Sequence, residues 1–294
     1  MLLAHWLGFL TNRPPRLMLD WPRLAPRPRA SRRRRLDPRL NWAAEVLEDR
    51  TLLSGVDPVL LKDINQVTED SWPSDWVDVN GTVFFTAEDG TTGRELWKTD
   101  GTAAGTVLVA DILPGFGDSD PVQLTNFGGT LYFSANDGTN GRELWKTDGT
   151  AAGTVLVTDI NPGSDGSNPF ELTNVNGTLF FRANDGANGF ELWKSDGTAA
   201  GTMLVADIRP GSGDSSPDDL TNVNGTLFFT ADDGANGREL WMSDGTAAGT
   251  VLVTDINPGS DGSNPFELTN VNGTLFFRAD DGTNGRELWT SDCT

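Results

Sequence analysis

Several side chains on which enzymes commonly depend are scarce in this sequence. Its 294 residues contain one cysteine, Cys293, and one histidine, His5. A single cysteine excludes a disulfide within the chain. Because no histidine follows residue 5, neither a Ser–His nor a Cys–His nucleophile pair can form in the remaining sequence. No segment approaches 18 consecutive apolar residues, so we expect no transmembrane helix.

Basic residues are also scarce outside the first fifty positions. Residues 1–50 hold 11 arginines and no lysine against five acidic residues, although the whole chain carries a formal net charge of −20. The body that follows is therefore strongly acidic, and we expect it to repel nucleic acid and anionic membranes. Cations, neutral sugars and basic proteins are the partners that suit such a surface.

The N-terminal segment, residues 1–54, differs in composition from the rest of the chain. It is rich in Arg and Pro, and we expect it to be disordered. We interpret this basic leader as a processed or targeting segment rather than as a nucleic-acid-binding arm. Two regions are thus predicted, the leader at residues 1–54 and a repeat body at residues 55–294.

The body is a tandem repeat with a period of 48 residues. The word Glu-Leu-Trp recurs without gaps, and its tryptophans are Trp97, Trp145, Trp193, Trp241 and Trp289. Residues 155–183 are identical to residues 251–279. This identity indicates that a block of two units was duplicated.

Each unit contains four short apolar runs bounded by turn residues, a pattern typical of four β-strands. Asn-Gly, or Gly-Gly in the second unit, joins the first two runs and supplies the positive φ that a two-residue hairpin needs. The longest link joins the fourth run to the next unit. Hairpins within a unit and a long crossover between units are typical of β-propeller blades.

We therefore predict an all-β, five-bladed β-propeller built from 48-residue, four-stranded repeats. The predicted blades span residues 74–112, 122–160, 170–208, 218–256 and 266–292. The last blade has no fourth run, whereas residues 58–64 are a fourth run that precedes the first blade. We predict that residues 58–64 supply the outer strand of the last blade and close the ring as a monomer.

The words ELWKSDGTAAGT and LTNVNGTLFF recur over about residues 59–292 and strongly resemble the ELWxxDGT repeat family of bacterial surface proteins. The stretch LEDRTLLSG, residues 47–55, resembles an N-terminal element of secreted planctomycete proteins. These resemblances imply a propeller-like repeat protein that is extracellular or displayed at the cell surface. They carry over no catalytic residue.

Aspartates recur in the turn between the second and third runs of every unit. Oxygen-rich loops bind Ca²⁺ in other secreted repeats, so these residues are candidate Ca²⁺ ligands. The alternative is that each carboxylate closes a turn on its own backbone, and the absence of a D-x-[DN]-x-[DN]-G loop favours it. No other cofactor is expected. The candidate Ca²⁺ ligands are Asp89, Asp137, Asp185, Asp233 and Asp281.

The recurring tryptophans admit two interpretations. One exposed indole on each blade would form a platform on which sugars stack. Alternatively, the indoles pack between blades, and their strict recurrence beside leucine favours this core role. The glutamates of the same words are expected to pair with the neighbouring arginines or to cap turns, and not to be catalytic.

The least repetitive stretch, residues 69–76, offers Trp72, Asp75 and Trp76 as candidate ligand-binding residues. A glycoside hydrolase would need unsymmetric carboxylates there, such as Asp70 and Asp75. The other loops are near copies of one another, which favours a non-enzymatic structural or adhesive module with many weak sites. Its partner would be an extracellular glycan or protein. The alternative is a lectin-like propeller that binds carbohydrate, and a hydrolase is less favoured.

Overall fold

The computed structural model describes residues 58–67 and 69–291. The chain divides into two compact units, Met1–Asp57 and Pro58–Thr294, and the described residues belong to the second. The predicted leader, residues 1–54, lies outside the described residues. All regular secondary structure in the described part consists of β-strands. In that part there is also no helix of the length and apolarity needed to cross a membrane.

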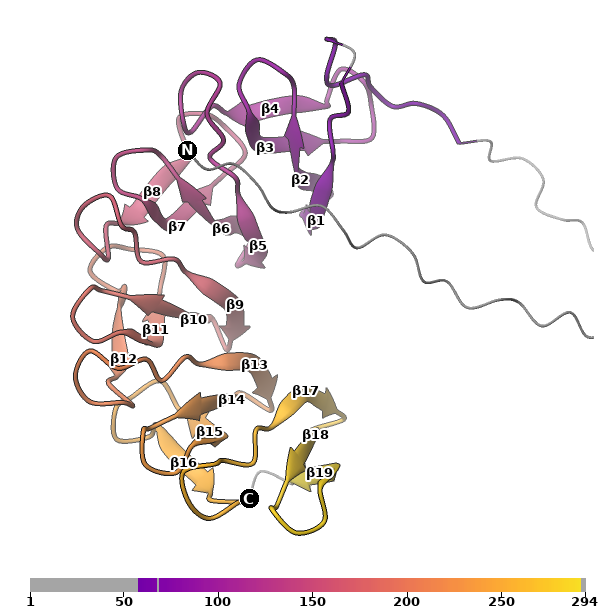
Figure 1. Cartoon of the computed structure of the whole chain (residues 1–294). Helices are drawn as coiled ribbons and strands as arrows, with labels where there is room; N and C mark the ends of the chain where they lie inside the picture. The colour runs from indigo at the N-terminus through magenta and orange to yellow at the C-terminus, as the bar shows by residue number, and fades with distance from the viewer. Residues whose placement is uncertain (1–57, 68, 292–294) are drawn as a thin grey trace, which may run out of the picture. The chain divides into compact units, whose positions relative to one another are not determined.

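The strands form five antiparallel sheets that follow the order of the chain (Figure 1). The first sheet contains β1 (Ser74–Val79), β2 (Thr82–Glu88), β3 (Arg94–Thr99) and β4 (Val107–Ala110). The second contains β5 (Val122–Phe127), β6 (Thr130–Asn136), β7 (Arg142–Thr147) and β8 (Val155–Thr158). The third contains β9 (Phe170–Val175), β10 (Thr178–Asn184), β11 (Phe190–Ser195) and β12 (Met203–Ala206). The fourth contains β13 (Asp218–Val223), β14 (Thr226–Asp232), β15 (Arg238–Ser243) and β16 (Val251–Thr254). The fifth contains β17 (Phe266–Val271), β18 (Thr274–Asp280) and β19 (Arg286–Ser291).

The inner hairpin of each blade turns where the sequence predicts. Asn176 and Gly177 have φ angles of 51° and 80°, and they connect β9 to β10. Two consecutive positive φ angles match the right-handed twist of the flanking strands, which is why Asn-Gly is favoured there. Gly128 and Gly129 adopt the same conformation in the second blade, with φ angles of 61° and 83°.

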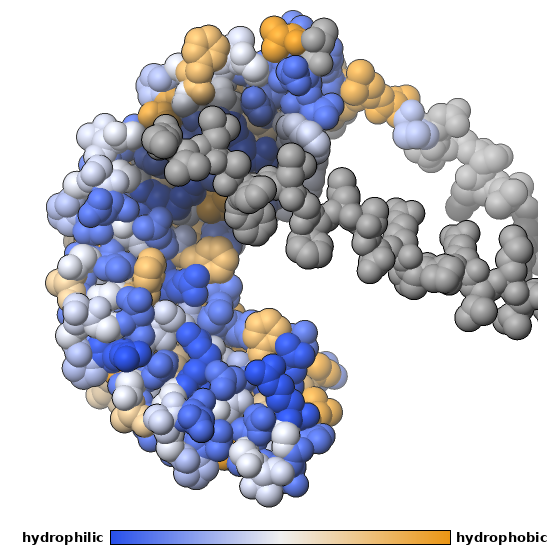
Figure 2. All heavy atoms as spheres, in the orientation of Figure 1, coloured by the Kyte–Doolittle hydropathy of each residue, from blue (hydrophilic) through white to orange (hydrophobic). Residues whose placement is uncertain are grey.

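A hydrophobic core lies between successive sheets. Between the third and fourth sheets, Phe180 and Leu192 of one pack with Leu227, Phe229 and Trp241 of the other. The innermost strands β1, β5, β9, β13 and β17 each contact the next in turn. Hydrophilic residues cover most of the face seen in Figure 2. The predicted all-β fold of five propeller blades is confirmed.

A buried glutamate holds the long link between successive blades. Glu95, on β3, accepts hydrogen bonds from the backbone N–H groups of Ile112 (3.1 Å) and Ser119 (3.0 Å) and from the Ser119 hydroxyl (2.6 Å). Glu143, Glu191 and Glu239 repeat this arrangement. Backbone N–H groups and serine hydroxyls of the link therefore bind these carboxylates, in place of the expected arginines.

Burial changes the acidity of two of these glutamates, Glu95 and Glu191. Loss of solvent raises the pKa of Glu95 to about 7. The hydrogen bonds from Ser119 and Ile112 lower the pKa, but their effect is smaller than that of burial. Burial also raises the pKa of Glu191 to about 7. A carboxyl group that loses its water favours the uncharged form unless its hydrogen bonds compensate. These groups therefore titrate near neutral pH.

The described sheets do not include the predicted closing strand. Residues 58–64 form no strand, and the described fifth sheet consists of β17, β18 and β19. Ile64 packs against Trp97 of the first blade, and the Lys62 ammonium group donates to the Thr106 carbonyl oxygen (2.6 Å). Ile112 packs on the second blade in the same way, although its run pairs with the first blade, so the closure of the ring by residues 58–64 stays a prediction.

Candidate functional site

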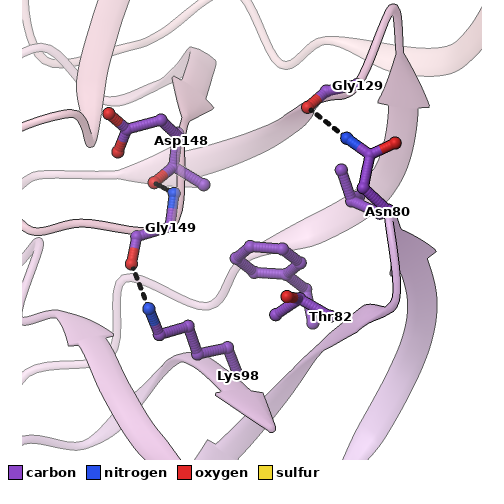
Figure 3. A pocket seen from close by; sticks show the side chains of 9 residues that line it. Asn80, Thr82, Lys98, Gly129, Asp148 and Gly149 are labelled. Atoms are coloured by element: carbon purple, nitrogen blue, oxygen red, sulfur yellow. Dashed lines mark hydrogen bonds between the residues drawn. The ribbon is translucent and has the colours of Figure 1, made fainter. Parts of the chain in front are cut away.

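A polar pocket lies between the first and second blades (Figure 3). The first blade contributes Asn80 from the hairpin turn, Thr82 and Phe84 from β2, and Lys98 from β3. The second blade contributes Gly129, Thr147, Asp148 and Gly149 from two of its turns and the end of β7. The cavity has a volume of about 190 Å³. It suits a small polar group rather than a large apolar ligand.

Two hydrogen bonds across the blade junction define the walls of this pocket. The Lys98 ammonium group donates to the Gly149 carbonyl oxygen (2.7 Å), and the Asn80 amide donates to the Gly129 carbonyl oxygen (3.4 Å). The Phe84 ring also lines the pocket, and its tip would be 3.2 Å from a Cβ atom placed on Gly149. Gly149 also has a φ of 88°, so this position needs glycine on both steric and conformational grounds.

Asp148 supplies the negative charge of the pocket. One of its carboxylate oxygens accepts hydrogen bonds from the Thr150 hydroxyl (2.7 Å) and the Thr150 backbone N–H (2.9 Å). These bonds lower the pKa of Asp148, and the charge of Lys98 lowers it further. The carboxylate is therefore ionised at neutral pH. The pocket combines a carboxylate, an amide, a hydroxyl and an aromatic ring, which can bind a polar ligand.

The same pocket recurs at the junction of the third and fourth blades, 96 residues further along the chain. Its cavity is also about 190 Å³. Lys194 donates to the Gly245 carbonyl oxygen (2.8 Å), and Asn176 donates to the Gly225 carbonyl oxygen (3.1 Å). The other lining residues correspond as well: Thr178, Phe180 and Asp244. The pocket therefore recurs with a spacing of two repeat units.

The junction between the second and third blades is filled instead. Tyr132 replaces phenylalanine there, and a Cβ atom placed on Gly197 would lie 1.9 Å from the tyrosine hydroxyl oxygen. Lys146 still donates to the Gly197 carbonyl oxygen (2.8 Å). Burial raises the pKa of Tyr132, and the charge of Asp196 adds to the shift. Phe127, which stands where Val79 and Val175 line the open pockets, packs edge-on against Tyr132, so two larger side chains occupy this junction.

The candidate ligand-binding residues of the first blade lie at a different place. Asp75 and Trp76 line a shallow pocket of about 290 Å³ between β1 and β5. The Trp76 ring stacks on Phe85 with 4.7 Å between ring centroids, and the Asp75 carboxylate accepts from the Ser74 hydroxyl (2.7 Å). Trp72 is 66% exposed and does not line this pocket.

The unusual backbone at these residues is a feature of every blade. Trp72 and Asp75 have φ angles of 43° and 58°, and residues at the same repeat positions also have positive φ angles. Each inner strand has an irregular register beside this position, as a β-bulge requires. The conformation therefore belongs to the fold and does not distinguish a single site.

The candidate Ca²⁺ ligands each bind their own turn. The Asp137 carboxylate accepts from the backbone N–H groups of Thr139 (2.8 Å) and Asn140 (2.8 Å) and from the Asn140 side chain (2.7 Å). Asp89, Asp185, Asp233 and Asp281 make equivalent bonds. Within residues 58–67 and 69–291, no three acidic, histidine or cysteine residues form a metal-binding group.

The recurring tryptophans pack in the cores between sheets. Trp97, Trp193 and Trp241 are buried, and Trp145 and Trp289 pack against neighbouring core clusters. Their indoles are therefore placed for packing rather than as exposed platforms. The sequence analysis missed the pocket around Lys98. Its signal in the sequence was that Met242 and Thr290 replace this lysine in the last two repeats.

No family model and no curated protein matches the chain. Among solved structures, puromycin hydrolase is 14% identical, with a TM-score of 0.50 over 75% of this chain and 36% of that protein. A puromycin-hydrolyzing peptidase from Mycobacterium tuberculosis is 9% identical, with a TM-score of 0.46 over 75% of this chain and 37% of that protein. The chain thus spans little more than a third of either protein. At this identity the likeness to puromycin hydrolase concerns the fold alone.

Proposed function

We propose that this chain is a non-enzymatic binding module, exported to the cell surface, whose pockets between blades are repeated binding sites. The observation that carries the proposal is the recurrence of one polar pocket at two junctions 96 residues apart. Weak identical sites on one chain gain from simultaneous engagement of a multivalent partner. The resemblance to ELWxxDGT repeat proteins supports the surface location.

The chemistry of the pocket supports binding rather than catalysis. Lys98 is held by a carbonyl oxygen, and Asp148 is the only carboxylate among the lining residues. A lone ionised carboxylate supplies neither the acid–base pair of a glycosidase nor an activated nucleophile. The pocket of the third and fourth blades has the same composition, so the same argument applies there.

A neutral carbohydrate is the ligand class that the lining favours. Phe84 is only 3% exposed, so it offers the C–H groups of a sugar a small apolar contact and no open ring face. The Asn80 amide, the Thr82 hydroxyl and the Asp148 carboxylate can donate to or accept from sugar hydroxyls. The net charge of −20 disfavours anionic glycans.

The test introduces, at the two open pockets, the tyrosine that stands at the junction of the second and third blades. Phe84→Tyr and Phe180→Tyr each add one hydroxyl, and together they should fill both open pockets. We expect the wild-type chain to bind neutral glycans on an array with two sites per chain, and the double variant to lose this binding while keeping its circular dichroism spectrum. As the matched control, Tyr132→Phe together with Phe127→Val should open a third pocket and raise the stoichiometry to three.

Two outcomes would count against the proposal. Equal glycan binding by the wild-type chain and the double variant would place the binding site elsewhere. An absence of glycan binding in every variant, with and without Ca²⁺, would remove carbohydrate as the ligand class. Turnover of chromogenic glycosides by the wild-type chain would contradict the non-enzymatic part of the proposal.

A further inference from the structure

The inner hairpin turns of neighbouring blades are joined by amide hydrogen bonds. At three junctions, the asparagine amide of one turn donates to the carbonyl oxygen of the second glycine position in the next turn. The pairs are Asn80 with Gly129 (3.4 Å, Figure 3), Asn176 with Gly225 (3.1 Å) and Asn224 with Gly273 (3.1 Å). At these junctions the side chain of one turn therefore restrains the glycine of the turn that follows.

The junction between the second and third blades lacks this restraint. Residue 128 stands where the other turns carry asparagine, but it is glycine and offers no side-chain donor to Gly177. A second amide contact is missing as well. Asn222 donates to the Asn174 carbonyl oxygen (3.2 Å), whereas among the described residues the Asn174 amide makes no equivalent bond to Asn126. The turn of the third blade is thus less restrained than that of the fourth.

Two of these turns have the same local sequence and different surroundings. Residues 172–181 and 220–229 both read LTNVNGTLFF. Gly177 is exposed, and a Cβ atom placed on it would meet no heavy atom within 4 Å. Gly225 is half-buried, and a Cβ atom placed on it would meet the Asn176 side chain. Any difference in reactivity between the two asparagine–glycine pairs must therefore come from tertiary contacts.

Asparagine followed by glycine is prone to lose its side-chain amide. Glycine has no Cβ atom to hinder its backbone nitrogen, which lies close to the side-chain carbonyl carbon of the preceding residue and attacks it within the chain. We propose that Asn176 is a site of spontaneous deamidation, which proceeds through a cyclic imide with Gly177. The inference concerns the covalent chemistry of this turn and does not rest on the proposed ligand.

The reaction needs water and no other reactant. The deprotonated backbone nitrogen of Gly177 attacks Cγ of Asn176, so that an N–Cγ bond forms. The Cγ–Nδ2 bond breaks, and the nitrogen takes up a proton and leaves as ammonia. Water then opens the imide at either of its carbonyl carbons. The product at position 176 is aspartate or isoaspartate, and no group is oxidised or reduced.

The attack requires the glycine to turn away from its place in the hairpin. At Asn224 this movement is opposed, because the Asn176 amide holds the Gly225 carbonyl oxygen. Gly177 has no such bond from residue 128. The hydrogen bond that each glycine N–H makes does not distinguish the two turns, since both go to an asparagine side-chain oxygen two residues before the pair.

Each repeat from the second onward holds another asparagine–glycine pair, and the structure protects it. In the third blade, the Asn188 side chain donates to the Asp185 carboxylate (2.8 Å), as does the Asn188 backbone N–H (2.8 Å). Gly189 is buried, and a Cβ atom placed on it would lie 2.6 Å from the Gly213 carbonyl oxygen. Neither partner of this pair has room to rotate, so it serves as an internal control.

Deamidation of Asn176 would change the junction of the third and fourth blades. The amide that donates to the Gly225 carbonyl oxygen would become a carboxylate, and two acceptors would then face each other. Asn176 also lines the pocket that contains Asp244. The reaction would therefore add a second negative charge to this pocket and weaken one contact between the blades.

Peptide mapping of the full chain by mass spectrometry tests the proposal. The folded chain is incubated in mildly alkaline buffer made with heavy-oxygen water, and fragmentation that distinguishes isoaspartate from aspartate locates each product. We expect Asn176 to convert several-fold faster than Asn224 and Asn188, with heavy oxygen incorporated and isoaspartate among the products. In the urea-unfolded chain, Asn176 and Asn224 should convert at equal rates, because their local sequences are identical.

Gly128→Asn is the decisive variant, because it restores the missing donor. Gly128 has a φ of 61°, which asparagine adopts at the same place in the other turns. We expect this variant to slow the conversion of Asn176 to the rate of Asn224. Ala151→Asn, at an exposed position in the turn between β7 and β8, is the control and should leave the rate unchanged.

Three results would overturn the proposal. Equal conversion of Asn176 and Asn224 in the folded chain would show that the contacts between turns do not govern the reaction. An unchanged rate at Asn176 in the Gly128→Asn variant would lead to the same conclusion. Conversion to aspartate without any isoaspartate would exclude the cyclic imide.

Discussion

Two leucines in the same four-residue word give the sharpest test of this architecture. Leu240 and Leu288 both stand in the sequence Arg-Glu-Leu-Trp, on β15 and β19. Leu240 packs with Val223, Phe228 and Leu275 in the core between the fourth and fifth sheets. Leu288 is largely exposed. The same substitution in the same local sequence therefore isolates the effect of tertiary packing.

The expected magnitudes follow from burial. Leu240→Ala removes buried methyl groups and leaves a cavity, so it should lower the free energy of unfolding by about 2–5 kcal/mol. Leu288→Ala removes mainly hydrated surface and should change it by no more than about 0.5 kcal/mol. Urea unfolding monitored by circular dichroism, at a protein concentration low enough to prevent association, measures both values.

Equal losses for the two variants would refute this reasoning, because they would mean that Leu288 is buried within an isolated chain.

Two further predictions concern acidity and a tight turn. Because the pKa of Glu95 is raised from 4.5 to about 7, the folded chain keeps a proton that the unfolded chain loses. The free energy of unfolding should therefore fall by about 2–3 kcal/mol for this group as pH rises from about 4.5 to 7 and then level off, and the melting temperature should fall with it. Glu95→Gln should make this part of the profile less steep, because Glu191 still titrates in the same range, and an unchanged slope would contradict the assignment. Gly197→Ala and Gly177→Ala both place a side chain at positive φ, but only the first meets a neighbouring side chain. Gly197→Ala should be the more destabilising by about 1–3 kcal/mol, and Tyr132→Phe should recover part of that difference, because the ring tip stays about 3.0 Å from the added Cβ atom; no recovery would show that the hydroxyl is not a cause.

Local sequence was sufficient to predict the blades. Asn-Gly at residues 176–177 sets the backbone of a hairpin turn because few other pairs accept two positive φ angles. The constant spacing of Trp97 and its counterparts predicted equivalent strands, which the five sheets confirm. Asp137 predicted a turn for a similar reason, since its carboxylate reaches backbone N–H groups only two and three residues away.

Contacts between blades were beyond the reach of the sequence pattern. Glu95 was expected to pair with arginine or to cap a turn, but it accepts hydrogen bonds from residues 17 and 24 positions later. The pocket joins Lys98 to Gly149, 51 residues away. No short-range rule links such positions, because they meet only after the sheets have stacked.

The sequence by itself determined the units of this protein: strands, turns and their period depend on backbone preferences and on neighbours within a few residues. Tertiary structure alone decided how the units pack against one another. It showed that the Tyr132 hydroxyl reaches Gly197 across the junction of the second and third blades. It also placed Ile64 against Trp97 of the first blade. Both results depend on side-chain packing across an interface, where fit in three dimensions decides and proximity in the chain does not.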